Sequence, residues 1–189
     1  MAISQTAPRR SLMSRLLGGG GVDAPAHAVY GALVGQARQP AFYLAGGVAD
    51  TVDGRFDLIA LHCMLVLKRL EADAGHRELA QRLQEVMFSD FDRALREMGV
   101  GDLSVGKRIK HMADAFYGRF LAYRDALDRP EIPGDTALAQ AIARNVFRGN
   151  PPTEAAAAAL AAYVRRQTAH LATLDDGALG QGDISFVAF

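Results

Sequence analysis

The sequence predicts an all-α protein, a single-domain bundle of six or seven helices with a central buried helix and a Gly-rich αα-hairpin. In successive segments, apolar residues recur at steps of three and four, the spacing of one helix face. Residues 58–67 are apolar nearly all round, which is typical of a helix enclosed by a core. A chain of 189 residues, 50% of them hydrophobic, is long enough to bury one core and too short to require two.

The charge balance, the cysteine content and the lengths of the apolar runs exclude several classes of protein. The 21 basic and 21 acidic residues cancel, which argues against attraction of the whole chain to nucleic acid. The single cysteine, Cys63, excludes an internal disulfide and fits a reducing compartment. No apolar run approaches the roughly 18 residues of a membrane span. These features predict a globular cytoplasmic protein.

Residues 1–22 are expected to be a flexible basic lead, and residues 23–189 the folded domain. Arg15 and the glycines that follow it interrupt any apolar core, so an export signal is excluded. Two interpretations of Arg9, Arg10 and Arg15 remain open. They belong either to a loose terminus, which is favoured because two turns of helix are marginal in water, or to a helix resting on an anionic membrane surface.

The first firm helix is expected over residues 23–39, with Asp23 as its cap and Pro40 as its end. A connector over 40–51 follows. It offers three side chains to the core: Phe42, Tyr43 and Leu44.

The central helix is expected over residues 54–74, capped by Asp50 or Asp53. His62 and Cys63 lie inside it. Adjacent helical positions diverge by about 100°, so these two side chains cannot chelate one ion together. They are expected to be core residues, and no metal site is predicted.

The next helix is expected over residues 76–98. Its apolar stripe moves round the helix after Val86, and Asp90, Arg93 and Glu97 continue the first stripe at i, i+3 and i+7. Arg93 is therefore expected to pair with both acids. This strip is either a solvated charge ladder or a polar edge available to a partner, and both interpretations remain open.

A Gly-rich turn joins this helix to the next. Gly99 suits a left-handed helix end, and Asp102 or Ser104 is expected to cap the following helix. Residues 101–107 match the start of a phosphate-binding GxxxxGK loop. Arg108 stands where a hydroxyl must bind magnesium, and the preceding element is a helix. No nucleotide binding is predicted.

The helix over residues 104–127 carries a regular core face. Its apolar members recur at steps of three and four: Val105, Ile109, Met112, Phe116 and Phe120. Lys107, Lys110, His111 and Gly118 fall opposite this face, with Arg108 and Arg119 flanking it. Lys107, Lys110 and Arg119 are therefore expected to be exposed. Gly118 costs about 1 kcal/mol relative to Ala, which suggests close packing by a neighbour. The basic face is either a docking surface or a solvated face.

The remaining segments complete the bundle. A linker over 130–135 leads to helices over 136–148 and 153–174, and residues 175–182 are expected to be loose and acidic. The apolar tail, 184–189, is expected either to tuck into the bundle or to bind another chain.

Catalysis has little support, because no paired carboxylates line an obvious pocket and no metal-ligand spacing occurs. No cofactor is expected. A helical bundle with a basic hairpin is better suited to binding another protein.

The stretch DRALREMGVGDLSVGKRIKHMADAFYGR, residues 92–119, resembles the signature block of the ubiquinol–cytochrome c chaperone family. TVDGRFDLIALHCMLVLKRL (51–70) and ARNVFRGN (143–150) are its outer landmarks. The resemblance implies a non-enzymatic helical assembly factor for the bc1 complex. It implies binding of unassembled cytochrome b or a bc1 assembly intermediate, in the bacterial cytoplasm or peripherally on the cytoplasmic face of the inner membrane. The alternative is a helical adapter with another client, or a protein that binds an anionic membrane surface.

The resemblance also implies which residues belong to a partner-binding surface. They are Asp90, Asp92, Arg93, Arg96, Glu97, Gly101, Asp102, Ser104, Gly106, Lys107, Lys110, Tyr117, Gly118 and Arg119.

Overall fold

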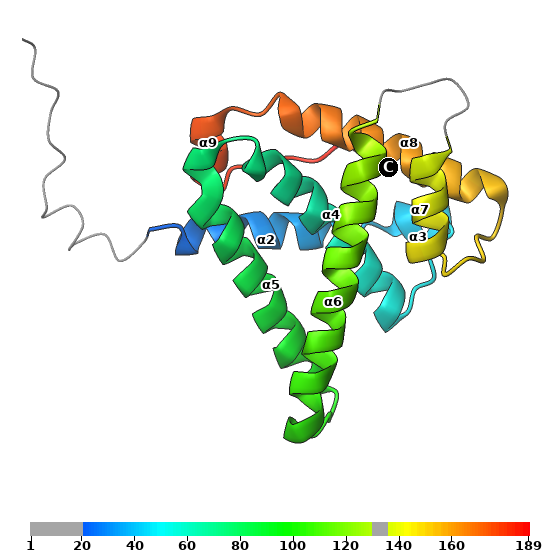
Figure 1. The fold of residues 1–189 in the computed structure, drawn as a ribbon, viewed down its shortest axis with the longest axis horizontal. Helices are drawn as coiled ribbons and strands as arrows, with labels where there is room; N and C mark the ends of the chain where they lie inside the picture. Colours follow the sequence, from blue (N-terminus) through cyan, green and yellow to red (C-terminus); the bar gives the residue numbers. More distant parts are fainter. Residues whose placement is uncertain (1–20, 130–135) are drawn as a thin grey trace, which may run out of the picture.

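The computed structural model describes residues 21–129 and 136–189, and over these residues the fold is all-helical (Figure 1). Arg9, Arg10 and Arg15 of the expected lead lie outside the described residues, as does the expected linker 130–135. The predicted helical bundle is confirmed: the described residues form six helices of nine residues or more, two five-residue helices and one 3-10 turn.

The helices follow the expected order, and the boundaries of the six longer ones differ from expectation by no more than three residues. The elements are α2 (Asp23–Ala37), α3 (Pro40–Leu44), α4 (Val52–Glu71), η1 (Ala74–His76), α5 (Arg77–Glu97), α6 (Asp102–Leu127), α7 (Ala137–Asn145), α8 (Glu154–Ala172) and α9 (Asp176–Gly180).

Helix α4 is the centre of the bundle, as predicted. Every side chain from residue 58 to residue 67 is buried, and α2, α5, α6 and α8 all pack against this helix. The hydroxyl of Thr51 caps it by accepting a hydrogen bond from the N–H of Gly54 at 3.1 Å. The predicted caps, Asp50 and Asp53, are wrong. Asp50 instead forms an ion pair with Arg55 at 2.7 Å.

His62 and Cys63 are fully buried core residues, as predicted. Nδ1 of His62 donates a hydrogen bond to the carbonyl oxygen of Leu58 at 2.7 Å, since a carbonyl can only accept. Nε2 is then the acceptor for the hydroxyl of Tyr163 on α8, at 2.8 Å. Burial lowers the pKa of His62 to about 4, so the imidazole is neutral and links α4 to α8 as an uncharged polar contact.

The connector between α2 and α4 contains the short helix α3, which the sequence pattern did not predict. Phe42 is completely buried and meets the ring of His62 edge-on, 5.3 Å between centroids. Leu44 is 85% exposed, so its predicted place in the core is wrong. A single turn of helix directs only one side of this connector inward.

The hairpin between α5 and α6 projects from the rest of the bundle (Figure 1). Gly99 ends α5 with φ +81°, the left-handed conformation predicted for it. Residues 102–107 form the first turns of α6 and follow another helix, so the strand-to-helix context of a phosphate-binding loop is missing. The predicted side-chain caps are wrong: Gly101 occupies the cap position, and Asp102 pairs with Arg96.

The C-terminal segment is more ordered than its composition indicates. Asp175 caps the short helix α9 by accepting from the N–H of Ala178 at 2.9 Å, so the expectation of a loose segment is wrong there. The tail packs on the core, which confirms the first of its two alternatives. The ring of Phe189 lies 5.0 Å from that of Phe42, and the N–H of Val187 donates to Gln167 at 2.8 Å.

Candidate functional site

A hollow of about 890 Å³ opens between the start of α4, the end of α5 and the first half of α6. We call it the basic cleft. Its apolar lining residues are Val52, Phe56, Leu95, Met98, Met112 and Ala115, and its polar lining residues are Asp53, Ser104, Lys107, Arg108, His111, Arg119 and Arg148. Four Lys/Arg side chains therefore surround an apolar floor together with a single acid.

The apolar floor is open to solvent at two points. Val52 is 64% exposed and Met98 is 53% exposed, although side chains of this kind are normally withdrawn from water. Met98 lies there because the apolar stripe of α5 turns toward α6 in its last two turns. The unbranched thioethers of Met98 and Met112 adapt to partners of different shape. The floor can thus accept an apolar side chain of another molecule.

The rim is basic because the first half of α6 presents the cations of Lys107 and Arg108 to it. Lys107, Arg108 and His111 are exposed on its first half. Arg148 approaches from the loop between α7 and α8, where it adopts a positive φ of 53°, a conformation uncommon for residues with a side chain. Its guanidinium lies 3.3 Å from a carboxylate oxygen of Asp53 on α4. Chain segments far apart in sequence thus build this rim.

The wall of the cleft contains a buried ion cluster. The side chain of Asp57 is only 1% exposed; its Oδ1 lies 3.1 Å from Nη2 of Arg119 and its Oδ2 lies 3.3 Å from Nη2 of Arg148. Arg119 also lies over the ring of Phe56, 5.4 Å from its centroid. Burial raises the pKa of Asp57 to about 6, although both arginines act to lower it.

The predicted solvent-facing position of Arg119 is wrong. Its side chain is 16% exposed and pairs with Asp57 of α4. Position 119 follows Phe116 by three residues and precedes Tyr123 by four, so it shares the side of α6 that faces α4. Arg119, one of the expected partner-binding residues, is therefore largely buried in the fold.

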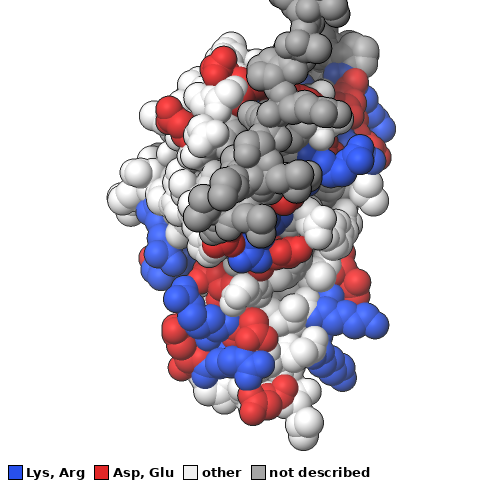
Figure 2. All heavy atoms as spheres, turned by 90° about the vertical axis from the view of Figure 1, so that its left-hand side faces the viewer, with Lys and Arg blue, Asp and Glu red and all other residues white. Residues whose placement is uncertain are grey.

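Most charged side chains of the predicted polar strip on α5 pair with other side chains of this protein. Arg93 pairs with Asp90, which also accepts from the hydroxyl of Tyr30 on α2 at 2.8 Å. Glu97 makes no ion pair with Arg93, so the expected double pair is wrong. Arg96 pairs with Asp92 at 2.6 Å as well as with Asp102. Figure 2 shows the resulting mixture of acidic and basic side chains over the α5–α6 part of the molecule.

The structure places three of the expected residues in the cleft: Ser104, Lys107 and Arg119. Lys110, Tyr117 and Gly118 are exposed on α6 outside the cleft lining, and the hydroxyl of Tyr117 donates to Gln84 of α5 at 2.8 Å. A Cβ atom at Gly118 would meet no described atom within 4 Å apart from the neighbouring backbone of its own helix. The expected crowding at Gly118 is therefore not produced by residues 21–129 or 136–189.

Several cleft residues were not among the expected site residues. Val52, Phe56 and Arg148 come from the outer landmarks of the signature block, and Met98 lies inside it. No local pattern marks them, because their placement depends on how α4 crosses α6 and on the turn after α7. None of the helices within 21–129 and 136–189 is both long enough and apolar enough to cross a membrane.

Comparison with known proteins gives the family. A model of the family described as ubiquinol-cytochrome C chaperone matches residues 44–186. The solved crystal structure of the Cbp3 homolog from Brucella abortus superposes with a TM-score of 0.81 at 36% identity, covering 94% of this chain and 97% of that one.

Two curated relatives are similar over most of this chain. The ubiquinol-cytochrome-c reductase complex assembly factor 1 of Xenopus laevis is 26% identical over 71% of this chain and 66% of its own length. The corresponding factor of Mus musculus is 24% identical over 71% of this chain and 44% of its own length. The chain thus spans just under two thirds of the first relative and less than half of the second. On the family match and the 36% identical structure, the chain belongs to the ubiquinol-cytochrome C chaperone family.

Proposed function

We propose that this protein is an assembly factor for the ubiquinol–cytochrome c reductase (bc1) complex and that it holds an unassembled subunit at the basic cleft. Family membership supports the class of function, as do the names of the two curated relatives. The observation that carries the proposal is the cleft itself, an apolar floor surrounded by cations on the signature helix α6.

The chemistry of the cleft specifies the client segment. An unassembled membrane subunit exposes apolar side chains that must be kept from aggregating, and Val52, Met98 and Met112 offer a complementary floor. A volume of about 890 Å³ is in the range of pockets that enclose small ligands, so it accommodates a few side chains and not a whole helix. Lys107 and Arg108 favour a segment with acidic groups beside its apolar ones. Cytochrome b, or an assembly intermediate that contains it, is the proposed client.

The rest of the signature block extends the docking surface beyond the cleft. Lys110 and Gly118 are exposed on α6. An added Cβ atom at Gly118 would have open space around it, so a partner backbone can approach closely there. The α5 residues Asp90, Asp92, Arg93, Arg96 and Glu97, with Gly101, Asp102 and Gly106 at the turn, shape the hairpin that presents this surface. No catalytic group, nucleotide or cofactor is required for such a holding function.

A membrane-embedded client places its assembly factor next to the membrane. We therefore propose that the protein works in the cytoplasm at the surface of the inner membrane, with Arg9, Arg10 and Arg15 as peripheral contacts. Binding to anionic lipid without a protein client is the alternative.

Reversing the rim charge tests the proposal. Lys107→Glu combined with Arg108→Glu is expected to weaken co-purification of the client by about tenfold or more at low salt and by less at high salt, because salt screens exposed charges. Thermal stability should stay within a few degrees, since exposed ionic groups contribute roughly 0–1 kcal/mol each. The measurement is quantitative recovery of bc1 subunits on the tagged full-length protein.

Arg77→Glu is the matched control, since Arg77 is exposed on α5 and does not line the cleft. It should leave client recovery unchanged. Equal recovery with the double variant and with this control would refute a client site at the cleft.

A further inference from the structure

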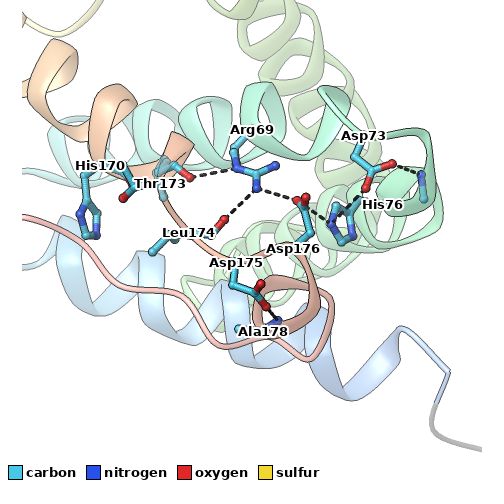
Figure 3. A network of polar contacts seen from close by, with 11 residues as sticks. Arg69, Asp73, His76, His170, Thr173, Leu174, Asp175, Asp176 and Ala178 are labelled. Carbon is cyan, nitrogen blue, oxygen red and sulfur yellow. Dashed lines mark hydrogen bonds and ion pairs between the residues drawn. The ribbon is translucent and has the colours of Figure 1, made fainter.

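A second group of chemically active side chains lies apart from the cleft, where η1 meets α9 (Figure 3). Asp73 and His76 come from the turn after α4, and Asp176 from the first turn of α9. One ligand atom from each of the three side chains lies within 4.8 Å of the others. Nε2 of His76 is 3.4 Å from Oδ1 of Asp176 and 3.9 Å from Oδ2 of Asp73.

The unsatisfied ring nitrogen of His76 indicates that this group of side chains lacks a binding partner. The residue is only 8% exposed, and its Nε2 is buried without a hydrogen-bond partner. A buried polar atom left without a hydrogen-bond partner is unfavourable for folding. This nitrogen points at two carboxylates, as Figure 3 shows. An imidazole nitrogen facing two carboxylate oxygens is a set of ligand atoms that suits a cation.

The two carboxylates are held in place by contacts outside the group. Oδ1 of Asp73 accepts a hydrogen bond from the N–H of Gly75 at 2.8 Å, which leaves Oδ2 facing His76. Oδ1 of Asp176 accepts from Nη2 of Arg69 at 2.6 Å. That contact holds the carboxylate of Asp176 in front of Nε2 of His76.

The guanidinium of Arg69 is held in place by hydrogen bonds to backbone carbonyl oxygens. It therefore supports Asp176 and does not move into the place of a metal ion. Its Nε donates to the carbonyl oxygen of Leu171 at 2.9 Å, and its Nη2 donates to that of Leu174 at 3.0 Å. Groups that orient a metal ligand in this way are as much part of a metal site as the ligands. The guanidinium charge also offsets one carboxylate, so a dication would bind here with moderate affinity.

We propose that Asp73, His76 and Asp176 bind one divalent transition-metal ion of the zinc type. One imidazole nitrogen and two carboxylate oxygens suit such ions, whose bonds to these atoms are about 2.0–2.2 Å long. The 3.4 Å between His76 and Asp176 is the separation of two ligands around such an ion, and Oδ2 of Asp73, 3.9 Å from Nε2 of His76, offers the third ligand atom. The bound ion joins the end of α4 to α9 and so fastens the C-terminal segment, independently of client binding at the cleft.

Zinc titration of the metal-stripped full-length protein tests the site. Isothermal titration calorimetry should show one Zn²⁺ per chain, and His76→Gln should weaken this binding by at least about tenfold. At a Zn²⁺ concentration about a hundredfold above the dissociation constant, the unfolding midpoint of the wild type should rise by roughly 5–10 °C. Asp73→Asn gives the same comparison if His76→Gln does not fold.

His170→Gln is the matched control, because His170 is half-buried, lies outside the group, and its Nε2 contacts the hydroxyl of Ser185 at 3.0 Å. It should bind Zn²⁺ as the wild type does. Equal Zn²⁺ binding by His76→Gln and His170→Gln overturns the proposal. So does a wild type that is stabilised by acid through His76 but not by Zn²⁺, since the group would then hold a proton.

Discussion

Replacing Arg119 by Ala is expected to lower the free energy of unfolding by about 3–5 kcal/mol at pH 8, the cost of leaving one member of a buried ion pair alone. Asp57, its partner, is 1% exposed and keeps only Arg148 as a counter-charge. Arg108→Ala is the control on the same helix, since Arg108 is exposed, and it should cost no more than about 0.5 kcal/mol. Chemical denaturation of both variants measures the difference.

The same variant should depend on pH in a definite direction. The pKa of Asp57 is raised to about 6 in the folded protein, above its usual 3.8, so the folded state holds the proton more tightly than the unfolded state does. Its contribution to stability therefore grows as the pH falls from about 6 toward 4. Acidification should shrink the penalty of Arg119→Ala. A penalty below about 1 kcal/mol at pH 8, or one that grows in acid, would contradict the buried pair.

Replacing Phe116 by Ala is expected to cost about 3–5 kcal/mol, from lost burial plus the cavity left behind. Phe116 is completely buried; its ring meets that of Phe88 edge-on at 5.7 Å and stacks on Phe120 at 6.5 Å. The aromatic contacts therefore join α5 to α6 at the base of the hairpin.

The adjacent Tyr117 provides the control for Phe116→Ala. Tyr117 is 48% exposed, and Tyr117→Ala should cost clearly less in thermal or urea unfolding. If both alanine variants lose the same stability, the assignment of the core face of α6 is incorrect.

The fold was largely predictable because buried residues recur in the sequence at the spacing of one helix face. Leu58 to Leu67 could only be the centre of a core, and the steps from Val105 to Phe120 defined one side of α6. Gly99 was correctly predicted as a left-handed helix end because few other residues tolerate that conformation. These features depend on local chemistry, which the sequence displays directly.

Features that depend on tertiary contact were predicted poorly. Arg119 was expected in solvent because a helical wheel does not show where α4 crosses α6. Thr51 was passed over as a cap in favour of Asp50 and Asp53, since all three are good cap residues and only the chain geometry distinguishes them. α9 was missed because its short, acidic sequence is typical of a loop, whereas packing on the bundle holds it helical.

The cleft itself combines both kinds of information. The signature block supplied Ser104 and Lys107, but the apolar floor needed Val52 and Phe56 from α4 and the rim needed Arg148 from beyond α7. Three distant segments meet there, and the buried Asp57 fixes Arg119 in the wall and Arg148 on the rim. This geometry connects the family motif with a surface that can hold a client.

Site-specific photo-cross-linking from inside the cleft tests the central claim most directly. A photoreactive amino acid at Met98, which lines the cleft and is 53% exposed, is compared with the same group at Leu44, which is 85% exposed outside it. In cells that assemble the bc1 complex, we expect Met98 to cross-link to cytochrome b, and Leu44 to give little or no such product. Equal cross-linking from both positions, or no bc1 subunit captured at Met98, would contradict a client-binding cleft.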